Sequence, residues 1–376
     1  MHAEGKALWL LFTLPRSLAR MLAERALVWV PICLSYALLM LAYGLRYQPL
    51  SRELVLGSAF CLLGLTLLTL IAAALGLNTV DPQAIENEQT SARGGPEMLL
   101  LCVLLAAFAS GFYGDTWLRL SLSVLLAAAS YGAWQDASRR LPFLLEPELR
   151  PAPRISVSDG LVCVLLVMLL QIFGARLAEE HLQLRPWPAR ALAFAAATVL
   201  VGAGASLLFR RRGLRDVGAA LGLTWGNGPQ AAFQEGLRWA LPGVGIAVVS
   251  ALALAYWPAF HALSQQATQA QASRAQASDW LIFFLLTGVA APCTEELLFR
   301  GMIYRDLRES LSPRASALLT ATVFVAIHPV SAALPVFLVS LFATAAFERS
   351  RSLASPLLVH VAYNGSVFLV SALIGA

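Results

Sequence analysis

Long uncharged stretches separate short polar segments along most of the chain. A helix needs about 20 mostly apolar residues to cross a bilayer. Stretches without Asp, Glu, Lys or Arg occupy residues 27–45, 54–80, 98–114, 120–134, 160–175, 191–209, 239–260, 280–294, 315–347 and 352–376. Because the 315–347 run is too long for one span and contains prolines, we expect two helices there, one ending near residue 328 and the next at about 331–347. The pattern predicts an all-α, polytopic transmembrane helix bundle of about 11 spans.

The composition excludes the soluble classes of protein. Of the 376 residues, 58% are hydrophobic and only 13% are charged, whereas an ordinary soluble domain carries about 25% charged residues. The five cysteines are scattered without a CxxC pair, so we expect neither disulfides nor a cysteine metal site. The sequence has no basic stripe with interleaved aromatic residues, which argues against a nucleic-acid partner.

The basic residues gather in alternate loops between the predicted spans. The clusters are the N-terminus and residues 139–154, 210–215, 300–314 and 349–351. Membrane proteins carry an excess of Lys and Arg in their cytoplasmic loops. We therefore expect a multi-pass membrane protein with its N-terminus in the cytoplasm and the 258–279 loop outside. The segments 46–53 and 78–97 fit this pattern poorly.

Charged residues inside a membrane span are costly, so each is a candidate for a functional site. One such group is the segment CTEELLFRG at residues 293–301. Glu296 and Arg300 are four residues apart on one helix face and can form an ion pair. Glu295 points to a different side and has no partner in its own helix, so it can serve as a proton acceptor. The alternative is that these charges only mark a helix end leaving the membrane.

Two further apolar helices carry polar residues at helical spacing. Phe324 and His328 share one face, and the following proline favours a helix end or kink at His328. His360 and Asn364 lie about 6 Å apart along one face. They can bond neighbouring helices, or they can donate to one developing oxyanion.

The depths of Glu295, His328 and His360 in the membrane, counted along their helix axes, agree only approximately. His360 lies about 12 Å from the cytoplasmic end of its helix. Glu295 lies about 20 Å from the cytoplasmic end of its own helix if that helix runs to about residue 308, or nearer if it stops at Gly301. His328 lies about 21 Å from the start of its helix near Arg314. We still expect the four polar groups to converge in a membrane-embedded pocket that can activate a water and polarise a carbonyl.

The three motifs together resemble the CPBP family. This family comprises the type II CAAX prenyl endopeptidases and the bacterial Abi, or bacteriocin-processing, proteins. Its pattern is Glu-Glu-x-x-x-Arg, then Phe-x-x-x-His, then His-x-x-x-Asn, and residues 295–300, 324–328 and 360–364 match it without a mismatch. The resemblance covers residues 280–366 and extends weakly to 213–223.

The resemblance implies an intramembrane endopeptidase with four catalytic residues. Glu295 and His328 would activate the hydrolytic water. His360 and Asn364 would stabilise the oxyanion. The reaction would hydrolyse a peptide bond in a membrane protein or peptide substrate, near the cytoplasmic leaflet of the bilayer.

The same resemblance suggests how the chain is divided. Glu296 and Arg300 would be supporting residues or substrate contacts. Residues 210–376 would form the CPBP-like protease core, with its catalytic helices in 280–376. Residues 1–209 would form an N-terminal membrane region of about six spans, whose role is open because the family core has fewer helices than this chain.

Zinc is the alternative to a metal-free site, as the metalloprotease label of the family implies. It would take Glu295, His328 and His360 as ligands. Against zinc, a neutral amide such as Asn364 is a poor ligand but a good oxyanion donor. Neither histidine has an evident carboxylate to orient it, because we expect Arg300 to occupy Glu296. We therefore expect no cofactor.

A function without catalysis is the second hypothesis. A membrane transporter or a non-catalytic membrane scaffold can use buried Glu and His groups for proton relay or helix pairing. A transport pathway predicts further polar residues in the N-terminal spans. Few are present there, which favours the enzyme.

Overall fold

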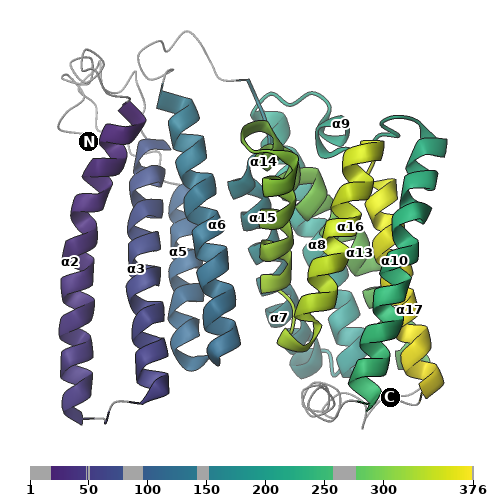
Figure 1. Ribbon diagram of the computed structural model, residues 1–376, viewed down its shortest axis with the longest axis horizontal. Helices are drawn as coiled ribbons and strands as arrows, with labels where there is room; N and C mark the ends of the chain where they lie inside the picture. The colour runs from purple at the N-terminus through teal and green to yellow at the C-terminus, as the bar shows by residue number, and fades with distance from the viewer. Residues whose placement is uncertain are drawn as a thin grey trace. The chain divides into compact units, whose positions relative to one another are not determined.

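The computed structural model describes residues 18–47, 49, 51–78, 96–141, 152–256 and 277–374 (Figure 1). Within these ranges every regular element is a helix, which confirms the predicted all-α class. Backbone contacts divide the chain into two compact units, Met1–Ala152 and Pro153–Ala376. This division is by contacts alone, and the functional division at residue 210 stays a prediction.

The first unit packs its helices around α3. Its described elements are α2 (Leu18–Tyr47), α3 (Arg52–Asn78), α5 (Pro96–Ser110), the short η2 (Gly111–Tyr113) and α6 (Thr116–Arg140). Helix α3 contacts α2, α5 and α6. Phe60, Phe108 and Phe112 pack together between α3 and the α5–η2 segment, with ring centroids 5.1–5.7 Å apart, and Phe112 meets the other two rings edge to face. Aromatic packing of this kind fixes the three helices against one another.

The second unit contains all three sequence motifs. Its elements outside the motif-bearing 277–310 helix are α7 (Val157–His181), α8 (Pro186–Arg211), α9 (Val217–Leu221), α10 (Pro229–Tyr256), α15 (Pro313–Ala326), η6 (Val330–Ala332), α16 (Ala333–Ser350) and α17 (Ala354–Ile374). Helix α10 packs against both α16 and α17. Small residues, including Ala247, Ala343 and Ala346, line this contact and are fully or almost fully buried. Small side chains let membrane helices approach closely.

The helix that carries Glu295 and Glu296 is one continuous rod with two π-helical segments. It runs through α12 (Ala277–Leu285), η4 (Leu286–Ala290), α13 (Ala291–Glu296), η5 (Leu297–Tyr304) and α14 (Arg305–Ser310). The sequence left open whether this helix stops at Gly301. It continues to Ser310, and π-helical turns of this kind occur often at functional sites.

Glycine at 301 allows a close approach between this helix and the short helix α9. A Cβ atom at Gly301 would lie 2.7 Å from the carbonyl oxygen of Leu221 at the end of α9. The α9 end also meets the start of α17, because the backbone N–H of Leu353 donates to the carbonyl of Gly222. Residues 217–222 are therefore part of the packed bundle that holds the motif helices.

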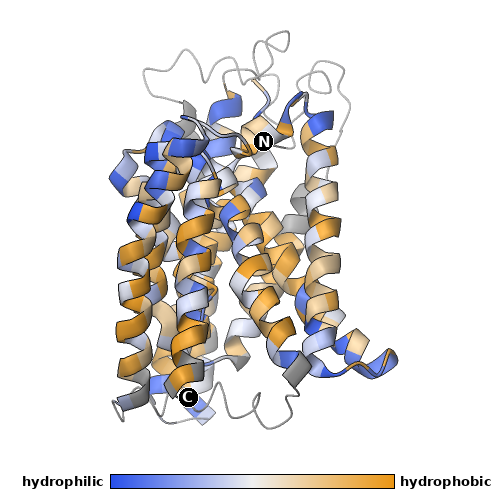
Figure 2. Ribbon diagram, turned by 90° about the vertical axis from the view of Figure 1, so that its right-hand side faces the viewer, coloured by the Kyte–Doolittle hydropathy of each residue, from blue (hydrophilic) through white to orange (hydrophobic). Residues whose placement is uncertain are grey.

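Each stretch that we predicted to span the membrane overlaps a helix. Within the described ranges, seven helices are long and apolar enough to cross a bilayer, and Leu101–Ser110, Pro313–Ala326 and Ala354–Val370 are shorter apolar helices. Helix α6 is in neither group, because serines, Arg119 and Gln135 interrupt its apolar residues. Figure 2 shows hydrophobic residues along the middle of the helices and hydrophilic residues mostly near their ends. The protein is therefore a multi-pass membrane protein.

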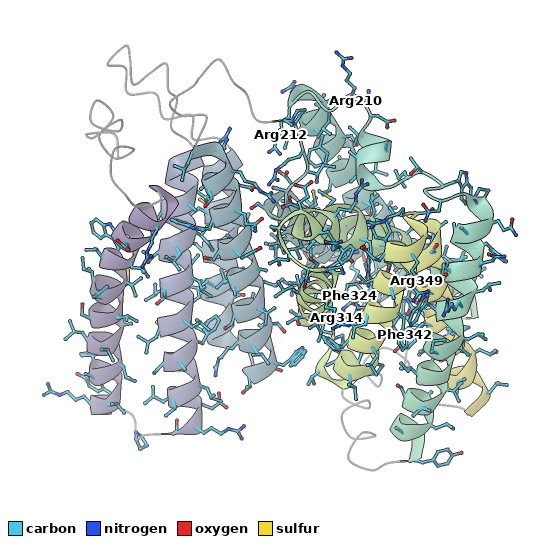
Figure 3. The ribbon with its side chains drawn as sticks, turned by 45° about the horizontal axis from the view of Figure 1, so that its top comes forward. Arg210, Arg212, Arg314, Phe324, Phe342 and Arg349 are labelled. Carbon is cyan, nitrogen blue, oxygen red and sulfur yellow. The ribbon has the colours of Figure 1, made fainter. Side chains whose placement is uncertain are left out.

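Arginines gather at one end of the second unit. Arg154, just before α7, pairs with Asp306 at 3.3 Å and with Glu309 at 2.9 Å, both in α14. Arg305 of α14 donates to the carbonyl of Ala219 in α9, and Figure 3 labels Arg210 and Arg212 at this end. The opposite end carries the pair Arg185–Asp279 at 2.9 Å. One arginine-rich end is what the positive-inside rule requires of a cytoplasmic face.

The orientation in the membrane can be tested with reporter fusions. A reporter at Arg308 should lie in the cytoplasm, and one at Gln269 should lie on the other side, because the arginine-rich end of the bundle resists translocation. Residues 1–17 and 257–276, which include the N-terminus and Gln269, lie outside the described residues. Gln183, in the loop that carries Arg185, should report the same side as Gln269. Finding all three reporters on one side would contradict the predicted topology.

Candidate active site

The second unit brings the first and third motifs into direct contact. His360 lies on α17, and Glu295 and Glu296 end α13. The ring of His360 places Nδ1 2.8 Å from Oε1 of Glu296 and Nε2 3.6 Å from Oε2 of Glu295. The His360 side chain is almost fully buried. One imidazole therefore lies between two adjacent carboxylates.

Glu296 and Arg300 form the ion pair that their spacing predicts. Arg300 NH1 donates to Oε1 of Glu296 at 3.0 Å, and only 0% and 2% of the two side chains is exposed. Arg300 NH2 donates to both the carbonyl oxygen and the hydroxyl of Ser340 in α16, each at 2.8 Å. The guanidinium also lies 5.2 Å from the centroid of the Phe324 ring. A single buried arginine thus connects the motif helix with α15 and α16.

Phe324 lies between the two histidines. Its ring centroid is 4.6 Å from that of His328 and 5.7 Å from that of His360, and it packs edge to face on His360 and Phe299. Figure 3 labels Phe324 within the second unit. His328, just past the end of α15, is half-buried, with Nδ1 2.7 Å from the carbonyl oxygen of Phe324. His328 therefore joins the cluster through the ring and backbone of Phe324.

Asn364 is held by the backbone of the motif helix. Its amide nitrogen donates to the carbonyl oxygen of Thr287 at 2.7 Å, and Thr287 lies in the π-helical segment η4. An asparagine amide has two N–H donors and an acceptor oxygen. The bond to Thr287 uses one N–H of Asn364 and leaves its second N–H and its oxygen outside this anchor.

The depth mismatch inferred from the sequence has a simple cause. Glu295 and His360 meet although their distances from the cytoplasmic ends of their helices differ. A Cβ atom at Gly301 would contact Leu353, at 3.5 Å, so these two positions lie at one level. Glu296 is about 7 Å above Gly301, and His360 is about 10 Å above Leu353. Residues 302–310 of the motif helix extend beyond the level at which α17 starts. Counting from the end of that helix therefore placed Glu295 deeper than His360.

Sequence reasoning missed Ser340 and Thr287. Both lie in predicted spans, and the search for ionisable groups did not count hydroxyl residues. Ser340 has a usable signal, since it is a polar residue in the apolar run 331–347. Thr287 has no such signal in the sequence. Asn364 contacts its backbone carbonyl, and every residue type has a backbone carbonyl.

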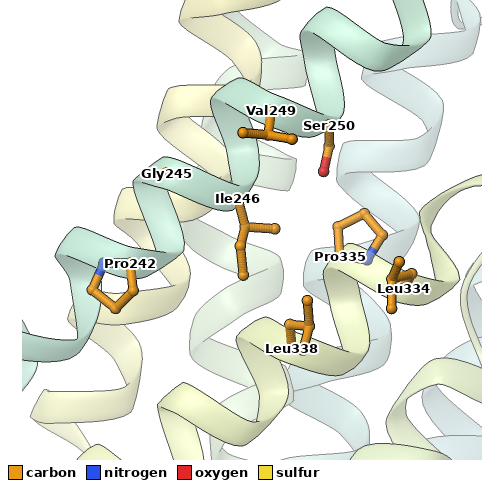
Figure 4. Close-up of a pocket in the computed structure, with 8 residues that line it drawn as sticks. All are labelled: Pro242, Gly245, Ile246, Val249, Ser250, Leu334, Pro335 and Leu338. Carbon is orange, nitrogen blue, oxygen red and sulfur yellow. The ribbon is translucent and has the colours of Figure 1, made fainter. Parts of the chain in front are cut away.

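An apolar cavity lies apart from the three motifs. It has a volume of about 370 Å³ and lies between α10 and the start of α16 (Figure 4). Its lining residues are Pro242, Gly245, Ile246, Val249, Ser250, Leu334, Pro335 and Leu338. Ser250 supplies the only polar side chain among them, so this cavity offers volume but no catalytic chemistry.

The zinc ligands that the sequence suggested are not grouped as a metal site among the described side chains. One argument from the sequence was wrong, because His360 does have an orienting carboxylate: Glu296 bonds to it and to Arg300 at once. His328 likewise has a carbonyl partner. Yet in the described part of the chain no three His, Cys, Asp or Glu side chains are grouped closely enough to hold a metal ion. The absence of a cofactor stays a prediction.

The buried ion pair leads to a stability prediction. Glu296→Gln should lower the free energy of unfolding by about 3–5 kcal/mol, because it leaves the charge of Arg300 buried without a counter-charge. Thermal unfolding of the purified protein in detergent measures the change. Glu309→Gln is the matched control, since the Glu309 side chain is 57% exposed and an exposed pair contributes about 0–1 kcal/mol. Equal stability of the Glu296→Gln and wild-type proteins would contradict the prediction.

Comparison with known proteins supports the resemblance that the motifs suggest. Residues 277–366 match a family model described as Type II CAAX prenyl endopeptidase Rce1-like. The matched segment contains all three motifs, whereas the weaker resemblance at 213–223 lies outside it. Neither a curated protein nor a solved structure gives a significant match to the chain. The similarity to the Rce1-like family of type II CAAX prenyl endopeptidases therefore covers residues 277–366, the part of the chain that carries the three motifs.

Proposed function

We propose that the protein is an intramembrane endopeptidase in which Glu295 activates the hydrolytic water. The observation that carries this proposal is the difference between the two adjacent carboxylates. Glu296 is 2% exposed and is held by Arg300 and His360, whereas Glu295 is 24% exposed and faces His360 Nε2. A general base needs an accessible carboxylate within reach of water and substrate. Glu295 meets that condition, and Glu296 does not.

The resemblance supplies the roles of the other residues. His328 would help Glu295 to activate the water. Nδ1 of His328 lies 2.7 Å from the carbonyl oxygen of Phe324, and the Phe324 ring packs on both histidines. Asn364 would donate its second N–H to the oxyanion, and His360 would assist it. Preorganised donors of this kind stabilise the charge that develops in the transition state.

The substrate would be a membrane protein or peptide cleaved near the cytoplasmic leaflet. The arginine-rich end of the second unit supports this side, since it has the composition of a cytoplasmic face. In a bacterial inner membrane the physiological target would differ from a prenylated CAAX protein, which bacteria generally lack. We propose that the enzyme nevertheless cleaves a prenylated CAAX peptide in vitro, because the matching family is that of the CAAX prenyl endopeptidases. The lipid bilayer is the surrounding medium.

The catalytic core would be residues 210–376, with residues 1–209 as an additional membrane region. Support comes from the packing of α9 and α10 with the motif helices. Helix α9 contacts η5, and α10 contacts α16 and α17. Helix α7 also contacts η5, so at least one helix before residue 210 contributes to the packing around the core.

A non-catalytic scaffold is the second candidate. The observation in its favour is that Arg300, Glu296, His360 and Ser340 bond to one another across three helices. Such bonds hold helices together in a membrane without any reaction. This candidate gives no role to the partly exposed carboxylate of Glu295, so a Glu295 variant distinguishes it from the enzyme.

Glu295→Gln should therefore abolish proteolysis while the protein still inserts and folds. A carboxamide keeps the shape of the side chain but cannot accept the proton of the water, so we expect a loss of about 10²–10⁴-fold in rate. The assay is cleavage of a quenched fluorogenic peptide that ends in a prenylated Cys-aliphatic-aliphatic-X sequence. Glu309→Gln serves as the control and should cleave at the wild-type rate. A Glu295→Gln variant with wild-type activity would show that the role is misassigned.

The metal-free mechanism has its own test. Purified active protein should contain much less than one zinc per chain by elemental analysis, and a strong chelator should leave cleavage intact. The reason is that the grouped donors serve one another: Glu296 holds Arg300 and His360. Stoichiometric zinc that is lost together with activity in His328→Ala and His360→Ala would make both histidines ligands and overturn the mechanism.

A further inference from the structure

The hydrogen bonds of His360 define which nitrogen carries its proton. Oε1 of Glu296 accepts from Arg300, and the Nδ1 atom of His360 lies 2.8 Å from the same oxygen. A carboxylate paired with arginine has no proton to donate, so Nδ1 must be the donor. In neutral His360 the proton is therefore on Nδ1. Nε2 then presents a lone pair toward Oε2 of Glu295, 3.6 Å away.

This tautomer limits what neutral His360 can do. With its one N–H given to Glu296, the ring has none left to donate to an oxyanion or a leaving group. It becomes a donor at Nε2 only after it takes up a second proton. The oxyanion role that the resemblance assigns to His360 thus requires a source for that proton.

Three charged side chains surround the His360 ring. Two carboxylates, Glu295 and Glu296, and one guanidinium, Arg300, form the ionic part of the cluster. Once Glu295 has taken up a proton during the reaction, passing that proton to the imidazole leaves the net charge of the cluster at zero, so the transfer buries no additional net charge. The other groups packed on it are the hydroxyl of Ser340, which bonds to Arg300, and the uncharged ring of Phe324, beyond which lies His328.

We propose that His360 is the proton-transfer partner of Glu295 and that Glu296, anchored through Arg300 to Ser340, is its positioning residue. This inference rests on the proposed function. As the water oxygen bonds to the scissile carbonyl carbon, Glu295 takes a water proton and the carbonyl becomes an oxyanion. The proton passes from Glu295 to Nε2 of His360, and Glu296 stabilises the imidazolium through Nδ1–H.

The second half of the reaction returns the proton. Nε2–H of His360 donates to the amide nitrogen as the oxyanion re-forms the carbonyl and the C–N bond breaks. The products are a carboxylic acid and an amine, and both Glu295 and His360 regain their starting states. The Nε2–Oε2 separation of 3.6 Å is slightly longer than a hydrogen bond, and catalytic hydrogen bonds commonly shorten when substrate binds.

A proton-transfer role for His360 can be distinguished from a simple oxyanion role, because only the proton-transfer role makes the effect of a His360 variant depend on the leaving group. An amide nitrogen must be protonated before it leaves, whereas an ester oxygen leaves without this help. We would therefore compare two probes: the prenylated fluorogenic peptide, and its depsipeptide with an ester at the scissile bond. Loss of an oxyanion donor slows both reactions alike, because both pass through the same oxyanion.

The wild-type protein should cleave both probes. His360→Ala should lower kcat/KM for the amide at least 100-fold, and the fold loss for the ester should be at least ten times smaller than that for the amide. Glu296→Gln, assayed at a temperature at which it remains folded, should change the amide-to-ester ratio in the same direction. Asp306→Asn is the matched control. It removes a buried carboxylate of the same helix that pairs with Arg154, but it should leave the ratio unchanged.

The outcomes are distinct. Equal losses on amide and ester in His360→Ala would overturn the proton-transfer role and leave His360 as an oxyanion donor only. An unchanged ratio in Glu296→Gln would remove Glu296 as the positioning residue. A wild-type protein that cleaves neither probe would instead contradict the proposed function itself.

Discussion

Arg300 carries a permanent charge in the interior of a helix bundle that is surrounded by lipid, and the arrangement of the site depends on how that charge is satisfied. The guanidinium has no exposed surface and takes its partners from its own helix and from α16, with an aromatic face from α15. A charge in such a place is tolerated only when it is paired and hydrogen-bonded. The requirement therefore fixes the relative positions of three helices whose remaining contacts are apolar and non-directional.

The same requirement separates the functions of two neighbouring carboxylates. Adjacent residues on a helix point about 100° apart, so only Glu296 can reach Arg300, and Glu295 is turned toward the more accessible side. His360 contacts both, with a different ring nitrogen for each. The structural carboxylate and the reactive one thus differ by a single position, and the arginine four residues later decides which is which.

Local features of this arrangement could be predicted from the sequence, and contacts between distant segments could not. The apolar stretches locate the helices, and the spacing of Glu296 and Arg300 predicts their pair, because both depend only on helix periodicity. The start of α10 at Pro229 rather than near residue 239 was missed, since its first turns are polar and lack the apolar signal of a span. The contact of Glu296 with His360, 64 residues apart, depends on how α13 and α17 pack. No pattern within either segment encodes that packing, so the sequence predicts that the polar groups converge but not which of them are in contact.

The two π-helical segments on either side of α13 change the direction in which the side chains beyond them point around the helix axis. Each extra residue in a helical turn rotates everything beyond it by about 100°. Thr287 in η4 faces Asn364, Arg300 in η5 faces Ser340, and Asp306 beyond η5 meets Arg154 and the N–H of Val157. In a rod of uniform α-helix these residues would be out of phase with one another, and their partners on α17, α16 and α7 could not all be reached. The widened π-helical turns let one continuous helix contact α17, α16 and the start of α7 on faces that regular α-helical periodicity would not align with them.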